Sequence, residues 1–464
     1  MWDQEARKRY TEYANKGTET IHHARGMIVG CAGAGKTTLL KRLLRCSEAE
    51  IRNVESTVGL EVHEEVFEIC NGVLKVINKN DNIDGVNVDG RESPETSAVN
   101  NYPRRITFFD FGGQCAYYAC HQIYLTRRAF YILVIDASKP LDKVVDKEVC
   151  DQDGTLFSSW TYAEIERKPD ILLVATHWEE NEYENDTYSF LQRVGSNLPN
   201  MMSLQDCIPR DNCFSTQFPL SPLEDLEKHI ISCAVDSRWS EKVPKEWLCL
   251  EVEILTFRQS KRILEFQYIV SKMPGEVKQS AKDMLRFYHD AGKVLYFNEQ
   301  DLHDVVIIDV QWFVDAFKNI ITDSLHTCGI SKSNEDWKLY YETGHLKDTL
   351  LTEFWRIKDN ELLQSLENKQ KRTEDLEKDP RCIMFHKMNV LTVMQRLGLV
   401  ALGKTSHYVP CMNRKPLPLK VKDMVYNAPK KTPVVSFHCC LSHWKLDNGT
   451  SISHPERIGS FKNS

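Results

Sequence analysis

The sequence predicts an α/β domain followed by a mainly helical domain, and three observations carry this prediction. Short apolar segments alternate with helix-patterned segments from Met27 to about Val235, which is typical of βα units around a mostly parallel sheet. A glycine-rich loop lies between the first strand and the first helix of this series. The composition shifts near 236–243, and most of the segments that follow are amphipathic helices.

The first domain, residues 24–235, is expected to hold a six-stranded sheet with helices on both faces. Nearly continuous apolar runs at Ala129–Ile135 and Ile171–Ala175 predict central parallel strands. Residues 1–23 are charged and helix-permissive and form a predicted lead-in, and the polar segment 78–104 is a predicted flexible insertion. The other expected strands are Met27–Val29, Val62–Ile69, Ile106–Phe109 and Cys213–Ser215, and the expected helices are Thr38–Cys46, Gln114–Thr126, Phe157–Arg167, Tyr188–Asn197 and Pro222–Ala234.

A linker at 236–243 is expected to lead to the second domain, residues 244–410. Helices followed by a two-stranded wing predict a winged-helix-like module there. The expected helices are Glu246–Gln259, Ile263–Lys272, Val277–Ala291, Val310–Ile321 and the amphipathic Cys382–Leu399, and the expected strands are Lys293–Phe297, Val305–Ile308 and Tyr408–Pro410. The charge-dense run Asp359–Asp379 is expected to be one solvated helix or loop. Residues 411–464 are an expected irregular tail or the truncated start of a further module.

Composition excludes several classes of function. With 464 residues, 42% of them hydrophobic and 27% charged, the chain is long enough for two or three globular domains. A net charge of −7 argues against nucleic acid as the main partner, and no apolar run is long enough to predict a membrane span. The charged N-terminus is unlike a secretory signal, and fifteen scattered cysteines without a C-x-x-C pair favour reduced thiols in the cytoplasm.

The loop Gly30–Thr37 fits the phosphate-binding pattern G-x-x-x-x-G-K-[ST] at every position. Its backbone N–H groups and the helix that follows can surround phosphate oxygens with partial positive charge. Lys36 would add a full charge on the outer phosphates, and the Thr37 hydroxyl would bind Mg²⁺. The expected nucleotide-binding residues here are Gly30, Gly33, Ala34, Gly35, Lys36, Thr37 and Thr38.

A second motif, Asp110–Gln114, follows the predicted strand Ile106–Phe109 and narrows the class of nucleotide hydrolase. Asp110 would hold Mg²⁺, and the D-x-x-G spacing would bring the N–H of Gly113 to the γ-phosphate. Gln114 stands where GTPases place the residue that orients the attacking water, so Gln114 and Lys36 are the candidate catalytic residues. No acid follows Asp110, whereas ATPases with paired acids place a glutamate there. These features predict a Ras-like P-loop GTPase fold.

Two further elements complete the expected site. Thr57 lies between the phosphate loop and the second strand, where a switch threonine binds Mg²⁺ in the triphosphate state. Thr176, His177 and Glu179 follow the strand Ile171–Ala175 in the position of the base-binding N-K-x-D motif. Because the Glu179 carboxylate is one methylene longer than aspartate, the preference for GTP over ATP stays open. Ser215 is a candidate for the last guanine-side loop.

Ala32 bears on the rate of hydrolysis. It occupies a loop position that is often glycine in small GTPases, and its methyl group would crowd the space around Gln114 and any arginine finger. We therefore expect slow intrinsic turnover.

These residues resemble those of a known family. Asp110–Gln114, followed by the segment Tyr117–Thr126, resembles the switch II stretch of Roc domains, the Ras-like GTPases of Roco proteins. Thr176-His177 is also similar to Roc usage, although Roc domains usually have aspartate at the position of Glu179. The runs Pro244–Trp247, Leu285–Phe297 and Val306–Trp312 are similar to the start of a COR region, so the resemblance covers roughly residues 25–410.

The resemblance implies binding of GTP or GDP with Mg²⁺, GTP hydrolysis, and signalling through regulators and effectors that the sequence does not name. Leucine-rich repeats and a kinase domain often accompany Roc and COR, but this chain carries neither pattern. The second half of COR, which holds much of the dimer contact in the family, would begin near Val434–Phe437. Dimerisation is therefore doubtful for this chain. Besides a slow GTPase switch, a scaffold that keeps its nucleotide without hydrolysing it and an ATPase are the alternatives.

Overall fold

A computed structural model describes eleven stretches of the chain, which form three sheets and the helices around them. Gln114 lies outside these stretches, as do most of the expected insertion and three expected helices, Gln114–Thr126, Phe157–Arg167 and Tyr188–Asn197. The described residues are 17–77, 104–113, 129–139, 170–180, 210–216, 223–236, 239–273, 278–299, 301–321, 334–367 and 373–413.

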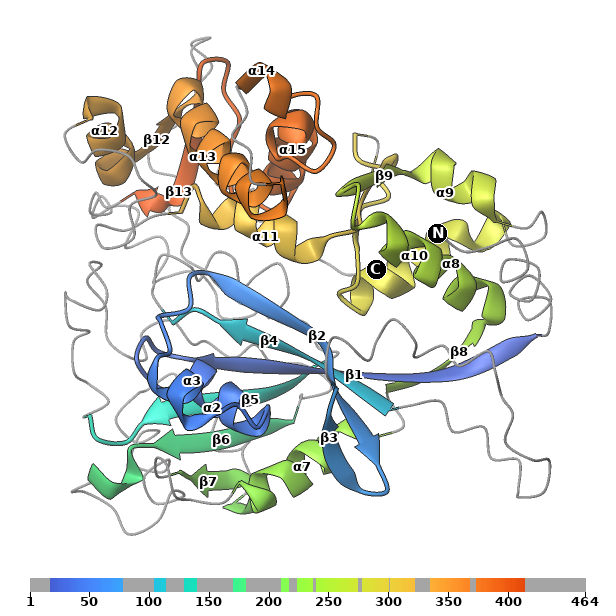
Figure 1. Ribbon diagram of the computed structural model, residues 1–464, viewed down its shortest axis with the longest axis vertical. Coiled ribbons are helices and arrows are strands. Elements are labelled where there is room, and N and C mark those ends of the chain that lie inside the picture. Colours follow the sequence, from blue (N-terminus) through green and yellow to red (C-terminus); the bar gives the residue numbers. More distant parts are fainter. Residues whose placement is uncertain are drawn as a thin grey trace, which may run out of the picture.

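The largest sheet has eight strands and forms the core of the first domain (Figure 1). Its order is β3-β2-β4-β1-β5-β6-β7, with β8 paired to the far end of β1. The pairs β4–β1, β1–β5, β5–β6 and β6–β7 are parallel, as predicted for a Ras-like domain. The strands are β1 Thr18–Gly30, β2 Leu60–Cys70, β3 Val73–Val76, β4 Arg104–Phe111, β5 Phe130–Asp136, β6 Ile171–Thr176, β7 Cys213–Ser215 and β8 Ser240–Pro244. All six expected strands are present, and β3 and β8 are additional.

The start of β1 and the strand β8 correct two expectations. Residues 18–23 were expected in a helix-permissive lead-in, but they extend β1 to thirteen residues. The expected linker 236–243 contains most of β8, which pairs antiparallel with β1 from Thr18↔Pro244 to His22↔Ser240. The His22 ring lies 2.6 Å from Ser240 Oγ and 2.6 Å from the Ala234 carbonyl oxygen. These partners lie more than 200 residues away, so local composition could not reveal them.

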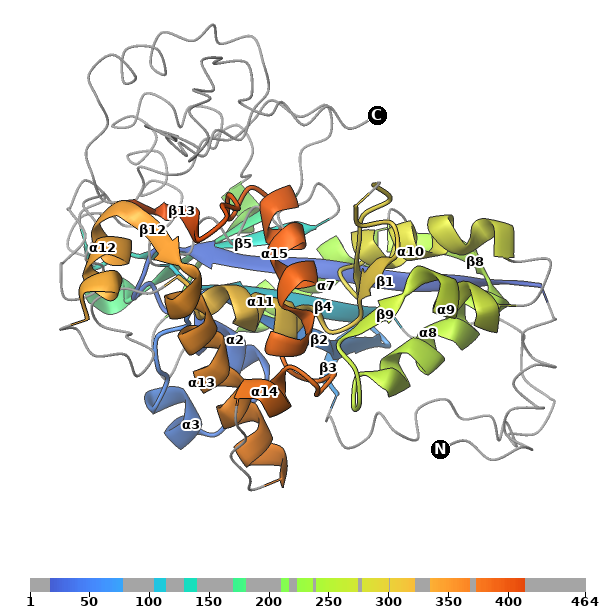
Figure 2. The same ribbon diagram turned by 90° about the horizontal axis from the view of Figure 1, so that it is seen from above.

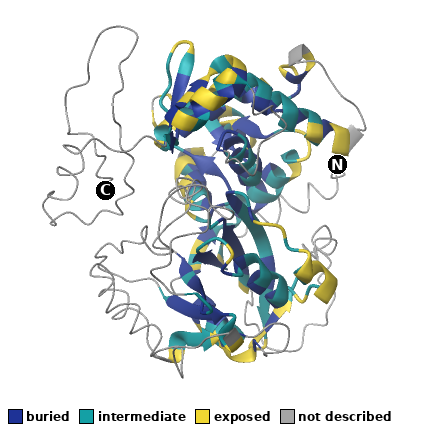
Figure 3. Cartoon of the chain, turned by 90° about the vertical axis from the view of Figure 1, so that its left-hand side faces the viewer, coloured by how far each residue is buried: buried dark blue, intermediate teal, exposed yellow. Residues whose placement is uncertain are grey.

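The two faces of the large sheet are covered by different elements. On one face, the helices α2 Lys36–Leu43 and α7 Glu224–Ala234 pack in one buried cluster with residues of β1, β4, β5 and β6. On the other face, alternate residues of the same strands join a cluster that continues into the second domain. In Figure 1, α11 and α13 of that domain lie above the sheet, and in the view from above in Figure 2 they lie in front of it. Figure 3 colours most of the sheet as buried.

The first half of the second domain matches the predicted winged-helix-like module. Three helices pack with a three-stranded sheet of order β10-β11-β9 around one apolar cluster. The elements are α8 Lys245–Phe257, β9 Ile263–Glu265, α9 Phe266–Lys272, α10 Ala281–Asp290, β10 Leu295–Tyr296 and β11 Val305–Ile307. The expected helix Ile263–Lys272 thus begins as a strand, because Ile263–Glu265 pair with β11 and complete the wing.

The second half of this domain is helical around a two-stranded sheet. Its elements are α11 Val310–Lys318, α12 Glu335–Thr343, β12 Gly344–Lys347, α13 Asp348–Glu367, α14 Thr373–Leu376, α15 Lys387–Arg396 and β13 Ser406–Asn413. The strand β13 extends three residues past the expected end of the domain at residue 410. Within the described stretches, no helix combines the length and the apolar character needed to traverse a bilayer.

The charged run Asp359–Asp379 is not the solvated segment that was expected. Asp359 is only 1% exposed and accepts hydrogen bonds from the backbone N–H groups of Ile383 (2.8 Å) and Met384 (2.9 Å). Burial raises the pKa of this carboxyl to about 7. Leu363 and Leu376 are fully buried within the same run. One of its charged residues, Asp359, therefore makes a tertiary contact that connects α13 to the segment before α15.

Candidate functional site

The phosphate loop connects the end of β1 to the start of α2. Gly30, Gly33 and Gly35 all have positive φ angles, of 149°, 74° and 84°. Lys36 begins α2, is 5% exposed, and donates a hydrogen bond from Nζ to the Cys31 carbonyl oxygen at 2.7 Å. Burial lowers the pKa of Lys36, and the nearby Asp110 carboxylate opposes this shift. The amine is thus held across the loop, on the side where phosphates would lie.

Three oxygen ligands converge beside Lys36, each from a different segment. The Thr37 hydroxyl lies 2.5 Å from the Thr57 hydroxyl and donates to Asp110 Oδ2 at 2.5 Å. The Thr57 hydroxyl donates to the same carboxylate oxygen at 3.2 Å. Asp110 is fully buried, and its Oδ1 has no hydrogen-bond partner in the described part of the chain. This donor set of two hydroxyls and a carboxylate suits a hard divalent cation such as Mg²⁺.

The electrostatics of Asp110 are consistent with a site that a cation completes. Burial raises the pKa of its carboxyl to about 6, although the Thr37 hydroxyl and the Lys36 ammonium lower it. A buried carboxyl with an orphaned oxygen is costly unless a cation or another donor approaches it. The structure therefore brings together Thr37, Thr57 and Asp110, which the sequence predicted as metal ligands.

Gly113 packs directly against the phosphate loop. Its carbonyl oxygen accepts a hydrogen bond from the N–H of Ala32 at 3.1 Å. A Cβ atom on Gly113 would overlap the backbone of Cys31 and Ala32, so only glycine fits at this close approach. The backbone of Gly113, whose N–H is expected to contact the γ-phosphate, is thus adjacent to the loop. Gln114 lies outside the described residues.

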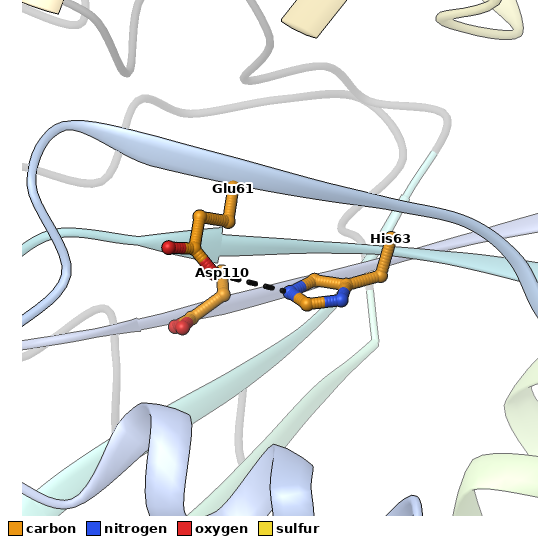
Figure 4. A group of neighbouring side chains, drawn as sticks. All are labelled: Glu61, His63 and Asp110. Atoms are coloured by element: carbon orange, nitrogen blue, oxygen red, sulfur yellow. Dashed lines mark ion pairs between the residues drawn. The ribbon is translucent and has the colours of Figure 1, made fainter. Parts of the chain in front are cut away.

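Glu61 and His63 of β2 are not among the site residues predicted from the sequence. One ligand atom from each of Glu61, His63 and Asp110 lies within 4.8 Å of the others (Figure 4). Glu61 pairs with Asp110 across the antiparallel strands β2 and β4, and His63 Nε2 lies 3.7 Å from Glu61 Oε2. The available signal was the i, i+2 spacing of Glu61 and His63 on a strand next to the Asp110 strand. These side chains extend the charged environment of Asp110 toward β2.

The expected base-binding residues stand at the carboxyl ends of β6 and β7. The Thr176 hydroxyl donates to the Ala34 carbonyl oxygen at 2.8 Å, which links this edge to the phosphate loop. His177 has a φ of 53°, and its Nδ1 lies 3.4 Å from the Asp136 carboxylate at the end of β5. Glu179 is exposed and lies close enough to Arg42 of α2 to affect its pKa. Ser215, also exposed, pairs with Ala175 in the neighbouring strand.

Comparison with known proteins agrees with this architecture. Residues 244–375 match the family model described as "C-terminal of Roc, COR-A domain". Over 355 residues the chain is 25% identical to "Probable serine/threonine-protein kinase pats1" of Dictyostelium discoideum, and this match covers 74% of the chain and 10% of that protein. Over 382 residues it is 23% identical to "Probable serine/threonine-protein kinase roco5" of the same organism, which covers 76% of the chain and 12% of that protein. The chain thus spans only a small part of these relatives' length.

A solved structure shares the arrangement of both domains. The "Structure of methanosarcina barkeri Roco2 RocCORdC bound to GDP" matches with a TM-score of 0.50 at 16% identity, over 85% of this chain and 97% of that one. At this identity the likeness shows the fold, which is a Ras-like domain followed by a helical COR domain. With this fold, the COR-A match and the two Dictyostelium relatives support placing the chain in the Roco family.

Proposed function

We propose that this chain is a slowly hydrolysing GTPase switch of the Roc–COR type, with GTP or GDP and Mg²⁺ as its ligands. The observation that carries the proposal is the convergence of Thr37, Thr57 and Asp110 from the phosphate loop, the segment 53–59 that leads into β2 (the switch segment) and β4. When bound, Mg²⁺ would neutralise charge on the outer phosphates. The GDP in the Methanosarcina structure supports a guanine nucleotide. We propose the cytoplasm as its location, because GTP is available there and thiols stay reduced.

The chain's own residues would divide the work of a switch. Lys36 and the N–H groups of the loop would bind the phosphates, and Thr176 would hold the base edge against the loop through its bond to Ala34. Gly113 would present its N–H to the terminal phosphate, and Gln114 would orient the attacking water. Ala32, which contacts Gly113, would limit the space for that water and keep turnover slow. A switch of this kind would act in signalling through protein partners that respond to its state.

Direct measurement of binding and phosphate release tests this proposal. Purified protein is titrated with labelled GTP, GDP and ATP in the presence of Mg²⁺, and phosphate release is then followed in a single turnover. We expect a preference for guanine nucleotides and slow release of phosphate. Equal affinity for ATP would reject the GTPase assignment, because Glu179 would then not discriminate between the bases. Tight GTP binding without phosphate release would support a scaffold instead, and rapid release would reject the role given to Ala32.

The switch threonine gives a prediction that separates the two nucleotide states. Replacing Thr57 by alanine should weaken the binding of GTP with Mg²⁺ about tenfold, because one ligand to the cation is lost. Binding of GDP should change less than about twofold, because a switch threonine releases the cation after hydrolysis. Calorimetric titration of both nucleotides measures this difference, with Ser56→Ala at the exposed neighbouring position as the control. An equal loss for GTP and GDP would contradict the switch role.

A further inference from the structure

The helix α11 of the COR domain has three polar side chains on the face that contacts Gly59 and the start of β2. Gln311, Asp315 and Lys318 follow one another at i, i+4 and i+7, so they share one face of the helix. Most of the remaining α11 residues are buried, and α11 begins at the N-cap Asp309, which accepts a hydrogen bond from the Trp312 N–H at 2.9 Å. The polar face is therefore held in a fixed orientation by a packed helix.

Gln311 forms two hydrogen bonds with the backbone of β2. Its Oε1 accepts from the N–H of Val62 at 2.8 Å, and its Nε2 donates to the carbonyl oxygen of Leu60 at 3.3 Å. On this edge β3 pairs only with Phe67–Cys70, so no strand of the described residues adjoins the first residues of β2 there. The amide of Gln311 takes the place of a paired strand at this point.

Asp315 and Lys318 extend this contact toward the predicted metal ligands Thr57 and Asp110. Asp315 Oδ1 accepts from Gln311 Nε2 at 2.8 Å and lies 3.5 Å from Lys318 Nζ. The stem of Lys318 lies over Gly59, where a Cβ atom would be 2.6 Å from Lys318 Cγ. The Gly59 carbonyl oxygen also accepts from the Gly112 N–H at 2.7 Å. One face of α11 thus contacts a segment that begins two residues after Thr57 and touches the Asp110–Gln114 motif.

From these contacts we propose that Gln311, Asp315 and Lys318 are positioning residues that hold Thr57 at the metal site. This inference rests on the proposed GTPase function and names the element of the COR domain that is coupled to the nucleotide state. In the structure, Thr57 touches Thr37 and Asp110 while α11 contacts Gly59, Leu60 and Val62. Contacts that exist in only one arrangement of a switch favour that arrangement. By reciprocity, GTP binding stabilises the same contacts with α11.

The test replaces Gln311 by leucine, which keeps the size of the side chain and removes its two hydrogen bonds to β2 together with the one to Asp315. The control is Gln267→Leu, at an exposed position of α9 in the same domain. Release of fluorescent GTP and GDP analogues is measured for each protein in Mg²⁺. We expect Gln311→Leu to release the GTP analogue about fivefold faster, because the net free energy of about one hydrogen bond changes a rate by this factor. GDP release should change less than about twofold.

The GTP–GDP difference separates positioning from a merely structural role. Equal acceleration for both nucleotides, or rates equal to those of Gln267→Leu, would overturn the inference while the GTPase proposal stands. If the wild-type chain bound no guanine nucleotide, both would fail. Hydrogen exchange of the Val62 amide in nucleotide-free protein supplies a second measurement. We expect about fivefold faster exchange in Gln311→Leu, and unchanged exchange would show that the bond to β2 does not hold this segment.

Discussion

Replacing Lys36 by alanine is expected to lower the affinity for both GTP and GDP by at least about a hundredfold. The Nζ atom lies 2.7 Å from the Cys31 carbonyl oxygen and is held across the phosphate loop, with the side chain 5% exposed. A hydrogen bond to a charged group contributes about 1.5–3 kcal/mol, and the full charge on the phosphates adds to it. Titration with fluorescent nucleotides measures the loss. Both nucleotides should be affected, because both carry the phosphates that the loop is proposed to bind.

A lysine on the same helix provides the matched control. Lys41 is partly exposed and donates to the Glu50 carbonyl oxygen at 3.2 Å, so Lys41→Ala makes the same change in charge outside the site. Its nucleotide affinity should stay within about twofold of wild type. Because burial lowers the pKa of Lys36, its removal should not destabilise the nucleotide-free protein, which thermal unfolding can check. Similar losses of affinity in both variants would show that the effect is not specific to the loop.

The phosphate site was predictable because its determinants are local. In a parallel sheet the loops at the carboxyl ends of neighbouring strands meet, so motifs after the first, third and fifth expected strands had to lie together. The structure places Thr37, Asp110 and Thr176 accordingly. Thr57 follows from the same topology, because the switch segment leads into the strand beside Asp110. The topology does not predict which base would donate hydrogen bonds to Glu179, because this carboxylate is exposed and no strand fixes its orientation.

The contact between the two domains was not predictable, because its residues look like ordinary surface residues in the sequence. Gln311 and Lys293 lie in segments of mixed polarity, and their partial burial depends on contacts with β2. The bulge in β2 between His63 and Phe67 was also not predictable from the sequence. It directs Glu64 and Glu65 toward the COR domain. Likewise β8 depends on pairing with the polar start of β1. Such long-range pairings lack the periodicity that identifies a helix or a central strand.

Lys293 joins the two domains through a partly buried ion cluster. Its ammonium lies 2.8 Å from Glu65 Oε1 of the β2 bulge and forms an ion pair with Glu251 of α8. Glu65 also pairs with Arg105 of β4 at 2.5 Å. Burial alone would lower the pKa of Lys293, but the two carboxylates raise it well above its usual value. Burial would likewise raise the pKa of Glu65, but Lys293, His23 and Arg105 hold it far below its usual value.

Replacing Lys293 by methionine should therefore lower the free energy of unfolding by about 2–4 kcal/mol, because two partly buried carboxylates lose their shared cation. Urea unfolding at pH 7, followed by tryptophan fluorescence, measures this change. Adding Glu251→Gln should restore part of the loss, since Glu65 keeps Arg105 as its partner. The control is Lys272→Met of α9, whose ammonium lies 4.0 Å from Glu253 of α8 in an exposed pair. An exposed pair contributes at most about 1 kcal/mol.

The dependence on pH distinguishes a charge effect from lost packing. Because the pKa of folded Glu65 lies below its unfolded value, its charged form stabilises the protein above about pH 4.5, and this contribution is lost as the pH falls through the folded pKa. The difference in stability between wild type and Lys293→Met should thus be full at pH 7 and shrink below about pH 4.5. A difference that stayed constant with pH would point to packing of the lysine stem. A loss no greater than that of Lys272→Met would show that the cluster does not hold the domains together.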